Sequence, residues 1–323
     1  MGRTSLEDKK RDFRRIYEEF IRDFRIYKKD IAKALNVTDY TATRRLKEAV
    51  DMKYLLNPQI RRRSFDNFPE YVSFFDCENS TTTFQKLKED NNVVHHAVMG
   101  GFANLITISN KEDIEIDGKK VGGGRRSDYH VAYAPNCLWN ESIQEMWEAA
   151  KKFNPKNYKP QNIITSHWGE TLDWWGSDFE ILFSEFKFNG REKYTPILQE
   201  HGMSTCKVDQ FLKMIDVSCT VYTRFFPNGI HAYDAYYFLF KSKYIDFLIN
   251  LFSKLPTSPF FFEVEDKLCM NAYVEKSSIR ERGVFNTDIS QLELLCLVNN
   301  LVERGIIEKE SHAIVEYHWS KPL

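Results

Sequence analysis

A faint internal repeat is the feature of this sequence that most limits how the chain can fold. Thr38, which opens one helical stretch, has a counterpart 166 positions later in Ser204, which opens another. The segment Phe102–Ile108 matches Leu268–Val274 in strand character at the same offset. Repeats longer than about 50 residues indicate duplicated domains rather than a solenoid. The chain of 323 residues is therefore expected to hold two copies of one unit.

Each copy reads as a helix-turn-helix followed by elements in the order β-α-β-β-α-β, which is the ferredoxin-like arrangement. Hydrophobic periodicity and turn residues predict these elements. In the first copy the helices of the helix-turn-helix are Leu6–Arg25, Lys28–Leu35 and Asp39–Met52, and the later elements are Val72–Asp76, Thr81–Asp90, Val93–Met99, Phe102–Ser109, Glu141–Lys152 and Asn162–His167. In the second copy they are Thr205–Asp216, then Ala235–Phe240, Ile245–Lys254, Phe260–Glu265, Leu268–Glu275, Ile289–Arg304 and Ala313–Trp319.

The expected fold class is therefore α+β, with a winged helix-turn-helix and a ferredoxin-like domain that both occur twice. The motif His167-Trp168-Gly169 returns as His318-Trp319-Ser320 at an offset of only 151, so the first copy carries extra sequence. The expected domains are residues 1–66 (winged helix-turn-helix), 67–170 (ferredoxin-like, with an insertion at 111–139), 171–230 (a second, degenerate helix-turn-helix) and 231–323 (second ferredoxin-like domain).

Charge is distributed unevenly between the start of the chain and the rest. Residues 1–64 contain 18 Lys and Arg against 10 Asp and Glu, whereas the whole chain has a net charge of −1. A basic segment attached to an acidic body is typical of a nucleic-acid-binding arm. The second helix-turn-helix differs, because residues 170–230 hold six basic and nine acidic side chains. That acidic field opposes binding to a polyanion, so we interpret the second motif as structural.

DNA contacts are expected from the third helix and from the wing after it. Hydroxyl and cationic side chains near the start of a recognition helix meet base edges and phosphates, and an arginine triplet in the wing would neutralise phosphates. The predicted DNA-binding residues are Thr38, Tyr40, Thr41, Thr43, Arg44, Arg45, Lys47, Arg61, Arg62 and Arg63. A basic helical domain that meets an acidic protein partner is the alternative interpretation.

Two stretches point to a known family: Val93 to Leu105 after a helix-turn-helix, and Leu172-Asp173-Trp174-Trp175 at the start of the second copy. In these residues the chain resembles the Lrp/AsnC (feast/famine) family of transcriptional regulators. The resemblance implies a small-molecule effector site after the second strand, at Met99, Gly100, Gly101 and Asn104. Asn104 stands where family members carry an acidic residue, and Glu265-Asp266-Lys267 replaces the second glycine pair.

Other signals favour structural roles. His95 and His96 are adjacent on a predicted strand, so their rings point to opposite faces and do not chelate one metal. His167 and His318 have no Cys, Asp or Glu partner at a ligand spacing. Gly122-Gly123-Gly124 could form an anion nest, although a flexible loop fits the sequence better. We predict no metal, no cofactor and no catalytic residue.

The compartment follows from the cysteines and from hydropathy. The six cysteines form no C-x-x-C pair, which predicts free thiols in a reducing cytoplasm. No apolar run approaches the roughly 18 residues of a membrane helix, and the charged N-terminus does not read as a secretory signal.

These observations predict a DNA-binding transcriptional regulator, not an enzyme, that forms a homodimer on double-stranded DNA and responds to a small-molecule effector. Two alternatives stay open. Siroheme decarboxylases are built from the same kind of helix-turn-helix and ferredoxin-like units, and they use His and Arg near the second and third strands against a tetrapyrrole carboxylate. His95 and His96 lie in roughly that region. The other alternative is a non-catalytic sensor whose sheets bind a small molecule.

Overall fold

The computed structural model describes residues 5–276 and 290–320 of the chain. It divides into two compact units, and each unit is built from two separate stretches of sequence. The first unit comprises Met1–Arg62 and Leu172–Ala232, and the second comprises Arg63–Thr171 and Tyr233–Leu323. No helix among the described residues is both long and apolar enough to cross a membrane.

The first unit is helical and contains one short two-stranded sheet. Its first stretch forms α1 (Leu6–Arg22), α2 (Lys28–Leu35), α3 (Asp39–Asp51) and β1 (Gln59–Arg62), and its second forms α6 (Ser177–Phe186), α7 (Tyr194–His201), α8 (Thr205–Ser218) and β7 (Cys219–Tyr222). Strands β1 and β7 pair antiparallel. The Thr38 hydroxyl caps α3 as predicted, because it accepts the backbone N–H of Thr41 at 3.3 Å.

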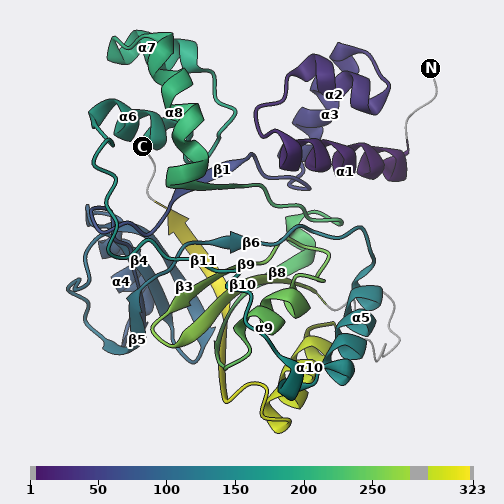
Figure 1. The fold of residues 1–323 in the computed structure, drawn as a ribbon, viewed down its shortest axis with the longest axis vertical. Helices are drawn as coiled ribbons and strands as arrows, with labels where there is room; N and C mark the ends of the chain where they lie inside the picture. The colour runs from purple at the N-terminus through teal and green to yellow at the C-terminus, as the bar shows by residue number, and fades with distance from the viewer. Residues whose placement is uncertain (1–4, 277–289, 321–323) are drawn as a thin grey trace. The chain divides into compact units, whose positions relative to one another are not determined.

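The second unit is a curled antiparallel sheet with helices on its outer face (Figure 1). The described strands have the order β5-β2-β4-β3-β11-β8-β10-β9-β6. Their bounds are β2 (Tyr71–Asp76), β3 (Val93–Gly101), β4 (Leu105–Ser109), β5 (Lys119–Arg125), β6 (His130–Val131), β8 (Tyr233–Lys241), β9 (Phe260–Val264), β10 (Lys267–Glu275) and β11 (Lys309–Ser320). The helices are α4 (Ser80–Leu87), α5 (Trp139–Lys152), α9 (Ile245–Phe252) and α10 (Ser290–Glu303), and two short 3-10 turns complete the described elements at Pro155–Asn157 and Ile230–Ala232.

The two edges of this sheet are joined by a single stretch of chain. Within that stretch β5 pairs with β2 at one edge, β6 pairs with β9 at the other, and Arg126 bridges to Val264 between them. Gly123 makes the close approach feasible. Its φ is +134°, and a Cβ there would lie 2.2 Å from the Val72 carbonyl oxygen. The joining of the two edges therefore depends on β5 having a glycine where its backbone comes closest to that of β2.

The sequence prediction was wrong for this part of the first copy. The predicted strand Asn162–His167 is irregular, and Lys119–Val131, which was predicted to be an insertion with a flexible glycine loop, supplies the strands instead. The Asp246 carboxylate holds the irregular stretch, because it accepts the backbone N–H groups of Gln161 and Ile163 at 2.6 and 2.9 Å. Because the Asp246 side chain satisfies these N–H groups, the backbone of this stretch does not have to pair with a neighbouring strand.

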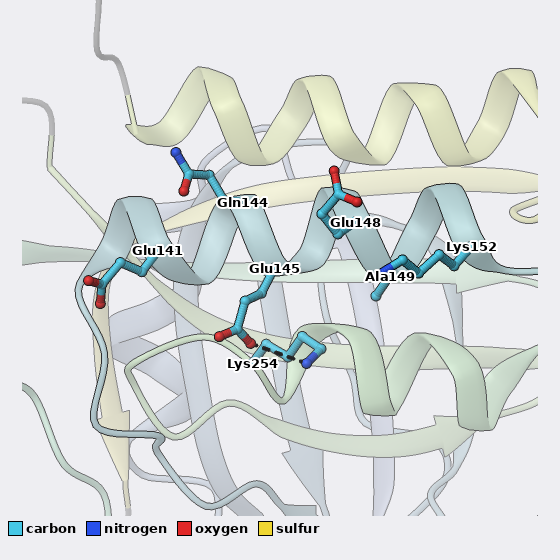
Figure 2. A pocket seen from close by; sticks show the side chains of 7 residues that line it. All are labelled: Glu141, Gln144, Glu145, Glu148, Ala149, Lys152 and Lys254. Carbon is cyan, nitrogen blue, oxygen red and sulfur yellow. Dashed lines mark hydrogen bonds and ion pairs between the residues drawn. The ribbon is translucent and has the colours of Figure 1, made fainter.

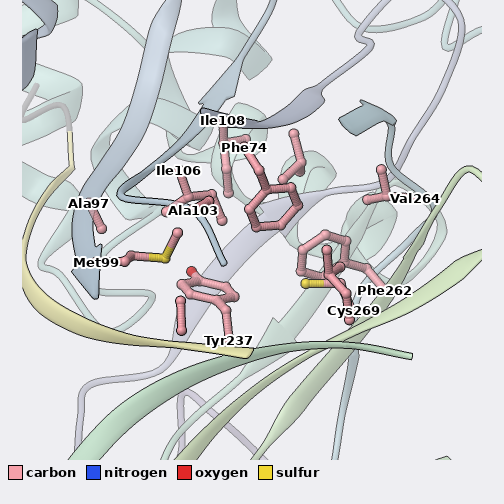
Figure 3. Packing of buried hydrophobic residues seen from close by; sticks show 13 residues of the cluster. Phe74, Ala97, Met99, Ala103, Ile106, Ile108, Tyr237, Phe262, Val264 and Cys269 are labelled. Atoms are coloured by element: carbon pink, nitrogen blue, oxygen red, sulfur yellow. The ribbon is translucent and has the colours of Figure 1, made fainter. Parts of the chain in front are cut away.

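The core of the second unit lies inside the curled sheet. The clustered side chains come from strands of both halves, and they point toward one another in Figure 3. The cluster comprises Val72, Phe74, Ala97, Met99, Ala103, Ile106, Ile108, Tyr237, Leu239, Phe262, Val264, Cys269 and Ala313. A second cluster around Phe84 and Leu87 joins α4 to the outer face of the sheet. Since large side chains fill the interior, a sizeable ligand cannot bind inside the curled sheet.

Candidate functional site

Polar side chains gather at one end of the curled sheet, which we call the rim. The strand register defines it: Tyr71 pairs with both Arg125 and Ser109, Ser109 pairs with Val93, and His95 pairs with Ser320. From β5 to β3 there are three strand spacings, roughly 14–15 Å. The rim therefore carries polar side chains from several strands, spread over a distance comparable to the width of a large organic ligand.

Two imidazoles lie together at the β3 and β11 side of the rim. His95 Nδ1 is 2.9 Å from the Ser320 hydroxyl, and the rings of His95 and His318 are 5.9 Å apart. His95 follows the alternation of Ala97 and Met99, so it lies on the inner face of the sheet. Its side chain is half-buried, and that of His318 is exposed. Imidazoles in such a position are suited to proton transfer.

His96 lies on the opposite face, as the strand alternation predicts. It is fully buried against α4, where its Nε2 donates to the Phe84 carbonyl at 2.9 Å and its ring packs on Phe84 and Trp319. Burial lowers the pKa of His96 to about 4. The side chain is thus a neutral part of the core and takes no part in the rim.

His96 is expected to make the protein acid-sensitive. The pKa of His96 falls from 6.5 to about 4 on folding. Between these values the unfolded chain binds a proton that the folded protein does not, so the free energy of unfolding is highest above pH 6.5 and decreases as the pH falls toward 4. The loss amounts to roughly 3 kcal/mol. Urea unfolding of the wild type and of His96→Gln over this pH range should reveal a larger loss of stability in the wild type, by roughly 3 kcal/mol.

The control for this titration is His312, whose pKa is raised because it hydrogen-bonds to Glu310 at 2.7 Å. Its stabilisation has the opposite sign, since it is complete below pH 6.5 and disappears as the pH rises through the folded pKa. His312→Gln should therefore retain the loss of stability at acid pH. A wild type that is equally stable at pH 4 and pH 6.5 would contradict the buried neutral state of His96.

A buried aspartate organises a second group of polar side chains. Asp128 is 4% exposed and accepts the backbone N–H and the hydroxyl of Ser64 at 2.8 and 3.0 Å. The Thr165 hydroxyl donates to its other oxygen at 3.1 Å, and His167 Nδ1 lies 2.8 Å from that oxygen. An anchored carboxylate at this distance fixes the orientation of an imidazole. Sequence spacing missed this pair because 39 positions separate Asp128 from His167.

Two arginines lie beside this group at the seam of the sheet, by which we mean the place where Arg126 bridges to Val264 between the two edges. Arg126 is fully buried; its Nε donates to Glu70 at 2.7 Å, and its guanidinium lies 4.0 Å from the Tyr129 ring centroid. Burial alone would lower the pKa of Arg126, but the Glu70 carboxylate reverses the effect and raises it. Arg125 is only partly buried, and it pairs with Asp66 at 2.6 Å. Arg126 is therefore a structural ion pair, whereas Arg125 reaches the surface of the rim.

The residues predicted to bind DNA have mixed environments in the helical unit. Arg45 is 2% exposed and pairs with Asp12 and Glu48. Arg62 pairs with Glu180 at 2.7 Å and stacks on Phe183, Arg61 stacks on Phe188, and Arg63 is partly buried. The exposed members are Thr38, Tyr40, Thr43, Arg44 and Lys47, and Thr41 is half-buried. Arg45 and Arg62 are thus paired with carboxylates inside the protein, whereas Arg44 and Lys47 are on the surface.

The residues predicted to bind an effector form the β3–β4 turn. Asn104 holds the turn, because its side-chain oxygen accepts the Cys77 N–H at 2.8 Å and its amide donates to the Cys77 carbonyl at 2.7 Å. Met99 is part of the inner core, and a Cβ on Gly101 would lie 2.4 Å from the His312 carbonyl oxygen. Gly100 is exposed. These four residues therefore have clear roles in the turn, and an effector role for them stays a prediction.

A shallow groove of about 580 Å³ lies on the outer face between α5 and the end of α9 (Figure 2). Its carboxylates are Glu141, Glu145 and Glu148, and Glu145 pairs with Lys254 at 3.3 Å. This surface would repel an anionic ligand. Among the described residues, no three His, Cys, Asp or Glu side chains gather as metal ligands would.

The chain is similar in fold to siroheme decarboxylase NirDL. The alignment covers 97% of this chain and 93% of that one, with a TM-score of 0.50 and 8% sequence identity. The same enzyme in complex with an iron-uroporphyrin III analogue aligns over 96% of this chain with a TM-score of 0.48 and 8% identity. No protein-family model and no curated protein sequence matches the chain.

This likeness corrects the function predicted from sequence. The prediction of a DNA-binding transcriptional regulator that is not an enzyme is contradicted, because the chain is similar in fold, over 97% of its length, to the enzyme siroheme decarboxylase NirDL. Membership of the Lrp/AsnC regulators is not confirmed. The alternative of a siroheme decarboxylase-like protein is the better supported one.

Proposed function

We propose that this protein is a tetrapyrrole-processing enzyme that removes carboxyl groups from the acetate side chains of a siroheme-type substrate. The observation that carries the proposal is the imidazole pair at the rim, His95 and His318, within a fold that is similar to that of siroheme decarboxylase NirDL. Fold alone does not establish function. The rim adds proton-transfer groups at one end of a sheet whose interior is filled by side chains.

Decarboxylation of an acetate side chain sets a simple chemical requirement. The bond between the methylene carbon and the carboxylate breaks, carbon dioxide leaves, and the electron pair left on carbon takes up one proton to give a methyl group. The enzyme must therefore hold an anionic substrate and supply a proton. We assign the proton donor to His95, which is half-buried and oriented by the Ser320 hydroxyl.

The opposite part of the rim is suited to the substrate's other carboxylates. A siroheme-type ring is flat and carries carboxylates around its edge, so its anchors must be spread widely. Arg125 is a candidate anchor on the outer face, opposite to His95, because its strand partner Tyr71 is adjacent to the inward-facing Val72. Trp168 offers an exposed indole beside the Arg125 guanidinium. Arginine binds carboxylates well because its donors match the two oxygens.

The same proposal includes a tandem duplication of the whole unit. Helices α2 and α7 have the same length, and their bounds are 166 positions apart. Arg25 and Arg191, which are also 166 positions apart, make reciprocal contacts. Arg191 donates to the carbonyls of Phe24 and Ile26 at 2.9 and 2.8 Å, and Arg25 donates to those of Gly190 and Glu192. Such reciprocity is what two copies related by a two-fold axis produce. A homodimer and a cytoplasmic location stay predictions.

The test is a direct assay with siroheme as the substrate. The full-length protein is incubated anaerobically with siroheme, and the product is analysed by mass spectrometry for loss of carbon dioxide. A perturbed tetrapyrrole absorbance spectrum together with decarboxylated product is the expected result. If the protein neither perturbs the spectrum nor forms product, the proposed function fails. Perturbation without product would assign the protein to tetrapyrrole binding alone.

A further inference from the structure

Three buried polar groups form a row across neighbouring strands of the sheet, away from the rim imidazoles. In the strand register Ser73 on β2 pairs with Thr107 on β4, and Thr107 pairs with His96 on β3. Residues directly opposite each other in antiparallel strands point to the same face, with Cβ atoms about 4.5–5.5 Å apart. His96 packs under α4, so the row lies on the outer face, between the sheet and that helix.

None of the three polar atoms has a hydrogen-bond partner among the residues that the structure describes. The atoms are Ser73 Oγ, Thr107 Oγ1 and His96 Nδ1, and the residues are 1%, 0% and 0% exposed. A buried polar group without a partner destabilises a protein, by about 1–3 kcal/mol each. Thr107 lies between the other two groups and opposite both, so a partner placed over Thr107 is within reach of all three.

We propose that one internal water molecule binds in this row and links Ser73, Thr107 and His96. Buried waters typically make about three hydrogen bonds to groups that lack other partners. The hydrogen bonds have one consistent set of directions: the water donates to His96 Nδ1, and it accepts the hydroxyl hydrogens of Ser73 and Thr107. His96 Nδ1 is an acceptor because Nε2 already donates to the Phe84 carbonyl.

On its other side Ser73 pairs with Gly123, which adds no polar side chain to the row. A cation is a poor alternative, because no acidic side chain belongs to the row. The water site would fix His96 as the Nε2–H tautomer and tie β2, β4 and β3 together beneath α4. This inference is independent of the proposed enzyme activity.

Thr107→Val tests the inference because it should change the Tm in opposite directions when a water is bound in the row and when the row is dry. Valine keeps the shape of threonine but lacks the hydroxyl. If a water is bound, the variant removes one of its partners and the Tm should fall, by roughly 2–4 °C. If the row is dry, replacing an unpaired buried hydroxyl by a methyl group should raise the Tm.

A second measurement reports on the water itself. Oxygen-17 relaxation dispersion detects long-lived internal waters, and the amplitude should decrease in Thr107→Val and in Ser73→Ala. The matched control is Thr83→Val, because the Thr83 hydroxyl already donates to the Asn79 carbonyl at 3.0 Å; this variant should leave the water signal unchanged. A higher or unchanged Tm for Thr107→Val, or an unchanged water signal in both row variants, overturns the proposal.

Discussion

Replacing His95 by glutamine is expected to lower the rate of siroheme decarboxylation by roughly 10²–10⁴-fold, the usual contribution of a positioned proton donor. Glutamine retains a polar group beside the Ser320 hydroxyl but does not deliver a proton at neutral pH. Substrate binding should change little, because the loss concerns the transition state. The expected pattern is therefore a large fall in kcat with KM nearly unchanged.

The matched control is His312→Gln on the same sheet. His312 lies next to Ala313, which is part of the inner core, so its own side chain lies on the outer face. That variant should decarboxylate at the wild-type rate. If His95→Gln is as active as the wild type, His95 is not the proton donor, and His167 beside Asp128 becomes the next residue to test. The proposed function would survive that outcome.

Local elements of the fold could be predicted from the sequence because their signals are local. α2 spans the predicted Lys28–Leu35, and α3 begins at the predicted Asp39 after the Thr38 cap. The strand over Val93–Met99 was also predicted, within the observed Val93–Gly101. In each case the hydrophobic period and the capping or turn residue lie within a few positions of one another.

The closure of the sheet could not be predicted in this way. Lys119–Val131 contains Gly122-Gly123-Gly124, a composition with low strand propensity. It forms strands only because β2 and β9 offer partners on both sides, and neither partner is adjacent to it in sequence. The absence of side chains, which predicted a loop, is what allows the backbone to approach Val72 so closely.

The functional prediction failed because charge was counted along the sequence and not in space. The basic excess of the first 64 residues seemed to belong to a DNA-binding surface. In the structure Arg62 is paired with Glu180 from the second half of the chain, which the count left out, and Arg45 is buried with Asp12 and Glu48, so it is not on the surface. The rim was invisible for the same reason, since His95 and His318 are brought together only by the pairing of β3 with β11.

The buried ion pair at the seam should have the largest effect on stability. Glu70→Gln keeps the size of the side chain but removes the carboxylate that pairs directly with the Arg126 guanidinium, which is fully buried. Breaking such a pair from one side costs about 3–5 kcal/mol, which corresponds to a fall in Tm of roughly 6–20 °C. Thermal unfolding followed by circular dichroism measures it.

A double variant that lacks both charges separates two contributions to stability: the destabilisation caused by a buried charge without its partner, and the net stabilisation given by the intact ion pair. Arg126→Met combined with Glu70→Leu removes both charges, so it should recover most of the stability lost in Glu70→Gln. Glu148→Gln is the control, because its pair with Lys151 is largely exposed and should contribute little. A double variant no more stable than Glu70→Gln would show instead that the hydrogen bonds of Arg126 themselves hold the seam, through the Ser127 carbonyl that it reaches at 2.7 Å.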